Sequence, residues 1–271
     1  MIRRRKRGLV PGTRKQAARP KLPKIVNHRD PMVSIIIPAM NERARLPSVL
    51  REASKVHPHS ETIVVANGST DGTAEIAAAA GARVIRFAEP LGHDVGRRVG
   101  AEAARGQVLL FIDADMVISA AELRPFVRAV LSGADVALNG YSGSAGRQMV
   151  HPVVLAKHSL NAWLSRPDLH GASMTAVPHA LSRQALAVIG PKLLEIPPLA
   201  HTVAAVRGLN IQIANTVAVG NMNPMRRRVG RSDPLASLVV GDHLDAVHWL
   251  IQEQGLRGGY SDLNRLRGKV R

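Results

Sequence analysis

Two aspartates, Asp113 and Asp115, directly follow a run of five apolar residues at positions 108–112. In an extended strand, side chains at positions i and i+2 project to the same side, so we expect the two carboxyl groups side by side at the strand end. Neighbouring carboxylates repel each other unless a cation or a proton neutralises them. Oxygen ligands of this kind suit Mg²⁺ or Mn²⁺. This Asp-X-Asp (DXD) motif therefore predicts a divalent metal site; a solvated strand end is the alternative.

Polar residues also follow three apolar runs upstream, at positions 33–37, 62–65 and 83–87. Between the four runs lie helix-like segments at 46–56, 74–80 and 93–105. Strands that alternate with helices predict a mainly parallel sheet flanked by helices, in which the ligand lies beyond the carboxyl ends of the strands. The polar residues expected at that edge are Pro38, Asn41, Glu42, Asn67, Asp71, His93, Asp94, Arg97 and Arg98.

The second half of the chain is less regular. Ser119 and Glu122 form the pattern of a capping box that opens a helix. Short apolar runs predict strands at 135–138 and 209–213, and helical patterns cover 153–164, 180–189 and 235–254. Residues 225–231, which contain four arginines, are predicted to form a basic loop. We expect one α/β domain made of a binding half at 31–140 and a second half at 141–271.

Three segments together resemble the family 2 glycosyltransferases, whose fold is the Rossmann-like GT-A domain. They are VSIIIPAMNE at 33–42, IVVANGSTDGT at 63–73 and LLFIDADMVI at 109–118. The resemblance covers about residues 32–140 and implies binding of a nucleotide-activated sugar. It departs from the family at Ala66, where an Asp usually stands, so the base of the nucleotide stays open.

The resemblance implies a role for each polar strand end. Asp115 would coordinate the metal directly, and Asp113 would contact the ribose or a metal-bound water. The base and ribose would lie against Pro38, Asn41, Glu42, Asn67 and Asp71. Arg97 or Arg98, early in a helix where anions are favoured, would contact the diphosphate. His93 and Asp94 would touch the sugar, and residues 171–178 resemble the acceptor-side loop, with a packed strand of small residues as the alternative.

An inverting transferase also needs a carboxylate that accepts the proton of the acceptor hydroxyl. Family members usually carry a Glu-Asp pair for this purpose, and here Glu195 has no Asp after it. Asp168, Asp242 and Asp245 are the other candidates, and Asp242 is slightly preferred over Glu195. Asp242 and Asp245 share a helical face, where His243 could add a metal ligand. A lone histidine such as His170, His179 or His201 more often has a structural role.

These patterns predict a metal-dependent hexosyltransferase that transfers a sugar from a nucleoside-diphosphate sugar to an unknown hydroxyl acceptor, with inversion as the family expectation. A non-catalytic nucleotide-sugar-binding or scaffold protein is the alternative. A nucleotidyltransferase would carry a glycine-rich phosphate loop after the first strand, and residues 38–41 do not form one. The G-x-G-x-x-G pattern of an NAD-binding domain is also absent after that strand.

The net charge of +17 is concentrated at the N-terminus. Residues 1–30 hold eleven Lys or Arg and one acid, and they predict a disordered basic tail. This tail would contact an anionic membrane surface, or it has no dedicated partner; nucleic acid is not expected because aromatic platforms are missing. The sequence has no Cys and no secretory or membrane-spanning segment, so we expect a cytoplasmic protein, peripheral at the inner membrane face if the tail binds lipid.

Overall fold

The computed structural model describes residues 22–143, 150–222 and 234–266. Its centre is a seven-stranded sheet with the strand order β3-β2-β1-β4-β6-β5-β7. Strands β1, β2, β3 and β4 pair in parallel, as do β5 and β7, whereas β6 runs antiparallel to both of its neighbours. The predicted α/β class and mainly parallel sheet are therefore confirmed. The strands are β1 (Val33–Ala39), β2 (Ser60–Asn67), β3 (Arg83–Phe87), β4 (Val108–Phe111), β5 (Val136–Asn139), β6 (His179–Ser182) and β7 (Ile211–Asn215).

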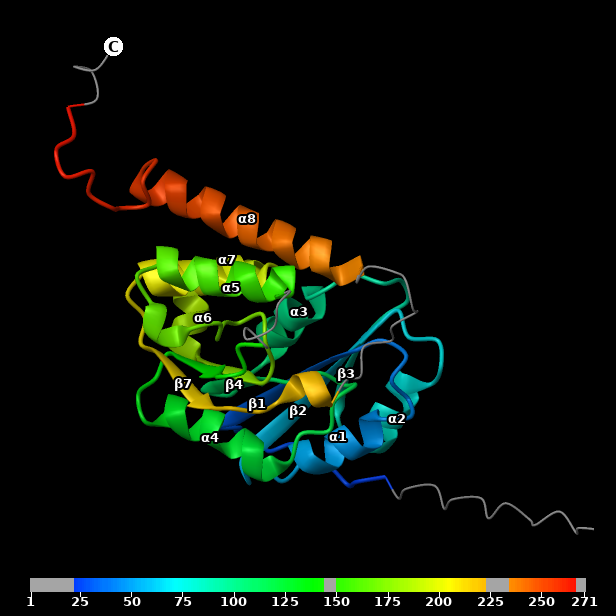
Figure 1. Cartoon of the computed structure of the whole chain (residues 1–271). Helices are drawn as coiled ribbons and strands as arrows, with labels where there is room; N and C mark the ends of the chain where they lie inside the picture. The colour runs from blue at the N-terminus through cyan, green and yellow to red at the C-terminus, as the bar shows by residue number, and fades with distance from the viewer. Residues whose placement is uncertain (1–21, 144–149, 223–233, 267–271) are drawn as a thin grey trace, which may run out of the picture.

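Helices cover both faces of this sheet (Figure 1). On one face, α1, α2 and α4 pack against alternate side chains of β1, such as Ile35 and Ile37. On the other face, α3, α6 and α7 pack against Ile36, which points the opposite way. Full burial on both faces explains why the central strands are continuous apolar runs. The helices that contact the sheet are α1 (Leu46–Ala53), α2 (Thr73–Ala79), α3 (Val95–Ala103), α4 (Ala120–Leu131), α6 (Arg183–Ile189) and α7 (Pro197–Val206).

The helix α5 (Pro152–Trp163) lies beside α7, and α8 (Pro234–Gln254) packs across both of them (Figure 1). Three short 3₁₀ turns complete the described elements, at Pro167–Leu169, Pro191–Glu195 and Val219–Asn221. None of the helices in the described part of the chain combines the length and apolar character that crossing a bilayer requires.

Two predictions about local structure need correction. The helix predicted at 180–189 begins only at Arg183, because residues 180–182 belong to β6 and pair with β4. The disordered tail predicted at residues 1–30 includes positions that pack on the domain. Ile25 is only 8% exposed, and its amide donates to the carbonyl of Ala80 at 2.7 Å. Residues 1–21 of that tail and the basic loop at 225–231 lie outside the described residues.

Glu61 holds together the amino-terminal edge of the sheet, opposite the edge expected to bind ligand. Its side chain is fully buried and accepts hydrogen bonds from Ser34 Oγ at 2.8 Å and from the Arg105 amide at 2.7 Å. The Arg105 guanidinium also lies 3.0 Å from Glu61 Oε2. This carboxylate therefore ties β1, β2 and the turn before β4 to one another.

Replacing Glu61 with alanine is expected to destabilise the fold by about 3–5 kcal/mol, because the buried donors and the arginine lose their acceptor. Denaturant unfolding of the purified variant measures this loss. Glu75→Ala is the matched control, since the Glu75–Arg86 ion pair is exposed to solvent and should contribute little. Equal unfolding midpoints for the two variants would contradict the role given to Glu61.

Candidate functional site

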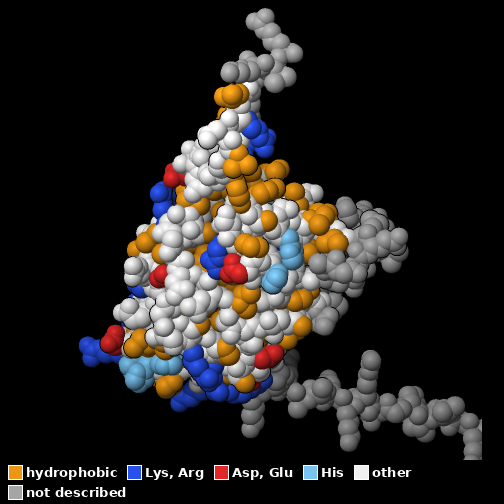
Figure 2. Space-filling view, turned by 60° about the vertical axis from the view of Figure 1, so that its left-hand side comes forward, with side chains coloured by type: hydrophobic (Ala, Val, Ile, Leu, Met, Phe, Trp, Pro, Cys, Tyr) orange, Lys and Arg blue, Asp and Glu red, His pale blue; other side chains and the backbone are white. Residues whose placement is uncertain are grey.

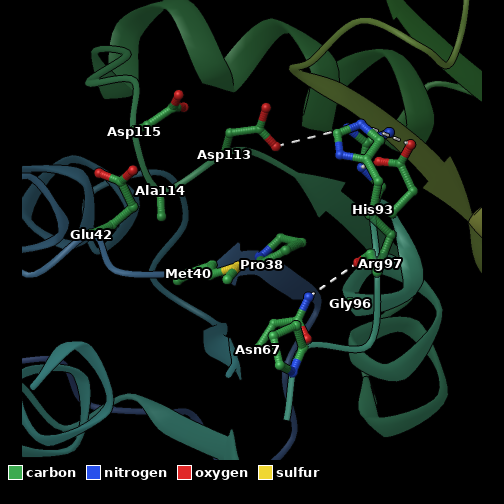
Figure 3. A pocket seen from close by; sticks show the side chains of 14 residues that line it. Pro38, Met40, Glu42, Asn67, His93, Gly96, Arg97, Asp113, Ala114 and Asp115 are labelled. Carbon is green, nitrogen blue, oxygen red and sulfur yellow. Dashed lines mark hydrogen bonds and ion pairs between the residues drawn. The ribbon is translucent and has the colours of Figure 1, made fainter. Parts of the chain in front are cut away.

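A cavity of about 380 Å³ opens at the carboxyl ends of β1, β2 and β4 (Figure 3). Parallel strands end at the same edge of a sheet, so the residues that follow them converge there. Eight of the predicted site residues line this cavity: Pro38, Glu42, Asn67, His93, Asp94, Arg97, Asp113 and Asp115. The other lining residues are Ala39, Met40, Pro90, Gly92, Gly96 and Ala114.

Asp113 and Asp115 both face the cavity from the end of β4, with Ala114 between them (Figure 3). The pKa of Asp113 is raised, first because its surroundings withhold water from the carboxylate, although one-third of the side chain is exposed. Arg97 opposes this shift, while the negative charges of Asp115 and Asp94 add to it. The site therefore favours a proton or a cation at Asp113.

Arg97 reaches the cavity because α3 lies unusually close to β1. A side chain at Gly96 would meet Pro38 at 3.0 Å, and one at Gly100 would overlap Ile36. Glycine at these two positions lets the backbones approach. The Arg97 guanidinium then lies 3.8 Å from Asp113 Oδ1 at the cavity wall, although the arginine side chain is only 8% exposed.

Asp94 holds Arg97 and His93 in place. Its carboxylate lies 3.1 Å from Arg97 Nε and 3.3 Å from His93 Nε2. Asp94 stands at the amino-terminal cap of α3 with a left-handed backbone, φ 63°, and its side chain makes no capping hydrogen bond. The carboxylate is thus directed to Arg97 and His93 in the cavity wall instead of to the helix end.

Asn67 shapes the opposite side of the cavity. Its side-chain amide donates to the Gly92 carbonyl at 3.1 Å and accepts from the Leu91 amide at 2.6 Å. These bonds hold the loop before α3 against the end of β2. Asn67 therefore builds the cavity through its loop as well as lining it.

Asn41 and Asp71 do not line the cavity. Asn41 Oδ1 accepts from the Thr70 amide at 2.8 Å, and Asp71 accepts from the amides of Arg43 and Thr73. Both side chains tie the loop after β1 to the loop after β2. Their predicted contact with the nucleoside stays a prediction.

Arg98 and Glu195 form an ion pair with each other at 2.9 Å, and neither lines the cavity. Asp168 is likewise paired with Arg166 at 2.8 Å. Of the proton-acceptor candidates, the structure thus joins Glu195 and Asp168 to arginines. The diphosphate contact predicted for Arg98 and the catalytic role predicted for Glu195 are not tested by these contacts.

Asp242 lies on α8, near the cavity wall that contains Asp94 and His93. Its pKa is raised, chiefly by burial and then by the negative charges of Asp94 and Asp245, while His93 opposes the shift. The neighbouring His243 donates through Nδ1 to the Val239 carbonyl within the same helix. Within the described ranges, no three His, Asp or Glu side chains are grouped as metal ligands.

His179 and His201 are structural, as expected for lone histidines. His179 stacks on Phe111, and His201 Nε2 contacts Asn161 Oδ1 at 2.8 Å. Burial lowers the pKa of each imidazole to about 3, so both are neutral at pH 7.

Residues 171–178 form turns and not the alternative strand, and the Met174 carbonyl in this loop accepts from Arg97 at 3.5 Å.

Sequence patterns do not predict every lining residue. Two lining residues are examples. Met40 lies within the segment at 33–42, and Gly96 lies between the segments at 63–73 and 109–118. Neither residue type indicates a particular chemistry. Asp94 is predicted only as a sugar contact, whereas in the structure it holds the side chains of Arg97 and His93 in the cavity wall. A helix-start Asp normally indicates a cap, so only its backbone conformation reveals this second use.

Comparison with known proteins finds a family similarity in the first half of the chain. The family model described as "Glycosyl transferase family 2" matches residues 34–148. Over these residues the chain is similar to glycosyl transferase family 2. The matched residues contain β2 to β5, all of β1 except Val33, and all fourteen residues that line the cavity, so the family 2 match and the cavity coincide.

Two curated relatives show how far this similarity extends. An uncharacterized glycosyltransferase of Mycobacterium tuberculosis is 35% identical over 104 residues, which are 38% of this chain and 46% of the relative. The dolichyl-phosphate beta-glucosyltransferase of Drosophila melanogaster is 38% identical over 99 residues, 31% of this chain and 30% of the relative. The chain therefore spans less than half the length of these family 2 relatives.

The fold similarity extends over most of the chain. Glucosyl-3-phosphoglycerate synthase from Mycobacterium tuberculosis, solved with Mn²⁺, UDP and phosphoglyceric acid, superposes with a TM-score of 0.58 at 23% identity. The match covers 86% of this chain and 80% of that one. At this identity, the comparison establishes the shared GT-A fold and leaves the chemistry to the site.

Proposed function

We propose that this protein is a metal-dependent glycosyltransferase of the hexosyltransferase type. It would move a sugar from a nucleoside-diphosphate sugar to a hydroxyl acceptor with inversion at the anomeric carbon. The observation that carries this proposal is the convergence of Asp113, Asp115, Arg97 and Asn67 on one cavity at the carboxyl edge of the sheet. The similarity of residues 34–148 to glycosyl transferase family 2 supports the same reaction class.

The residues of the cavity fit a divalent cation. Among the described residues that line it, four carboxylates accompany one guanidinium, and Asp113 has a raised pKa. A nucleoside diphosphate is itself anionic, so it needs additional positive charge to enter such a cavity. Mg²⁺ is typically held by one or two carboxylates together with substrate phosphates, and Mn²⁺ accepts the same oxygen ligands. Asp115 would coordinate the ion, and Asp113 would hold it, a bound water or the ribose.

When bound, the ion would neutralise the charge that develops on the leaving diphosphate. Structures of the Mycobacterium tuberculosis synthase contain UDP with Mn²⁺ or with Mg²⁺, which supports this choice of ions. Arg97, fixed by Asp94, would contact the diphosphate from the other side. Pro38, Glu42 and Asn67 would contact the nucleoside, and His93 the sugar.

Asp242 is the preferred proton acceptor. A carboxylate with a raised pKa is a stronger base, and Asp242, although it does not line the cavity, is close enough to Asp94 and His93 for their charges to affect it. The acceptor hydroxyl would transfer its proton to Asp242 as its oxygen bonds to the anomeric carbon and the bond to the diphosphate breaks. Glu195 remains the second candidate, with its charge engaged by Arg98.

A second candidate function is a nucleotide-sugar-binding scaffold without turnover. It is favoured by Ala66, a buried residue at the end of β2 that supplies no side-chain acceptor for a base. Calorimetric binding of a nucleoside diphosphate without product from any acceptor would support it. Contact of the basic tail with an anionic membrane surface, and a cytoplasmic location, stay predictions.

A thermal-shift screen of nucleotide sugars tests the proposed ligand class. A ligand that binds the native state at 100 times its Kd stabilises it by about 2.7 kcal/mol, which raises the unfolding midpoint by several degrees. We expect one nucleoside class to raise the midpoint with Mn²⁺ or Mg²⁺ and to lose the effect in EDTA. Asp115→Ala should abolish the shift, whereas Asp168→Ala, altered outside the cavity, should retain it. No shift with any donor and ion would reject the proposal.

A further inference from the structure

Residues 255–266, which we call the C-terminal projection, expose leucines that the fold leaves uncovered. After α8 this segment leaves the body of the molecule, on the side of the sheet opposite residues 22–30 (Figure 1). Leu256 is 92% exposed, Leu263 81% and Leu266 66%. Figure 2 shows hydrophobic and basic side chains along this protruding part. Single exposed leucines are ordinary, but three leucines on one projection suggest a surface that binds to a partner or to a membrane.

The projection is held in a defined shape. Tyr260 Oη donates to the Ala162 carbonyl at the end of α5, at 2.8 Å. The Arg257 guanidinium donates to the carbonyls of Tyr260 and Ser261, at 2.9 and 2.6 Å. Leu263 has a left-handed backbone, φ 56°, which is costly for a leucine, yet its side chain gains no burial from it. These contacts hold the leucines outward.

An indole and basic residues accompany the leucines. Trp163, whose carbonyl also accepts from Tyr260 Oη, is 48% exposed beside the projection. Arg257 and Arg265 belong to the projection, which has one acid, Asp262. The sequence continues with Arg267, Lys269 and Arg271. Leucine with tryptophan and excess Arg and Lys is the composition of segments that lie in the interface of an anionic bilayer.

We propose that the C-terminal projection, together with Trp163, docks this protein on an anionic lipid membrane. The leucines would enter the headgroup and acyl boundary while the basic residues contact lipid phosphates. Burying one leucine side chain changes a binding constant by roughly tenfold or more, so three produce strong but reversible attachment. A protruding segment suits insertion into a fluid bilayer better than it suits packing against a flat protein face.

The test is sedimentation of the full chain with vesicles. Wild type should pellet with vesicles that contain about 30% phosphatidylglycerol and much less with pure phosphatidylcholine. The variant L256S/L263S/L266S should bind the anionic vesicles at least about tenfold more weakly. The matched control L131S/V188S/I213S removes three hydrophobic side chains that are exposed on α4, α6 and β7, and should bind like wild type.

Two further readouts distinguish docking through the projection from attachment through the basic tail and from dimerisation. In a W249F background, the emission of Trp163 should shift to the blue on binding; attachment through the basic N-terminal tail alone would leave it unchanged. Equal binding by the triple variant and wild type, or no binding of wild type, would overturn the proposal. So would light scattering that shows a dimer for wild type and a monomer for the triple variant, since a second copy would then cover the leucines.

Discussion

Asp115→Ala is expected to reduce donor turnover by about two to three orders of magnitude. If Asp115 holds a cation against the diphosphate, its removal leaves the charge of the leaving group without several kcal/mol of stabilisation. The measurement is release of nucleoside diphosphate from the donor identified by the thermal-shift screen, with Mn²⁺, with Mg²⁺ and with EDTA. Wild type should respond strongly to the ion, and the variant weakly.

The matched control is Asp168→Ala. Asp168 is also a carboxylate, but it is paired with Arg166 and does not line the cavity. It should keep turnover near that of wild type and the same dependence on the ion. If Asp115→Ala turned over donor as fast as wild type, the metal role of the DXD motif would be rejected, whatever the donor.

The parts of the fold that the sequence predicts are those where local pattern and burial agree. The strand at Arg83–Phe87 matches its predicted range, and Ser119 and Glu122 make the expected capping box at the start of α4. Both faces of β1 and β4 are buried, so these strands appear in the sequence as continuous apolar runs. Such runs are stable only as buried strands of the sheet. The carboxyl ends of those runs then place the polar residues of the cavity.

The errors arise where tertiary contacts decide. Residues 180–182 are small or aliphatic and could continue a helix, but pairing with β4 makes them a strand. The sequence does not indicate α7, because most of its residues are buried, which removes the amphipathic pattern. The Arg98–Glu195 ion pair joins residues 97 positions apart in the sequence, a contact that no local pattern indicates. The same applies to Asp242 on α8, whose charge interacts with Asp94 and His93 although nearly 150 positions separate them in the sequence.

Asp242→Asn is expected to lower kcat by about 10²–10⁴-fold with little change in donor binding, since a general base contributes on this scale. Hydrolysis of the donor, with water as the acceptor, measures the loss, and the donor-induced thermal shift should persist. The raised pKa of Asp242 also sets the direction of the pH dependence. The base must be ionised to accept a proton, so kcat/KM of the wild type should fall as the pH decreases through that raised pKa. The Asp242→Asn variant should not show this decrease.

Glu195→Gln distinguishes Asp242 from its rival. The amide keeps the size of the side chain while it weakens the ion pair with Arg98, so this variant should lose some stability and little kcat. The opposite result would be that Glu195→Gln no longer shows the fall of kcat/KM at low pH, whereas Asp242→Asn still shows it. The proton acceptor would then be Glu195, and its contact with Arg98 would have to open during turnover. Asp242 lies on α8, in the second half of the chain. Loss of kcat in Asp242→Asn would therefore also mean that the second half completes a site whose donor side resembles family 2.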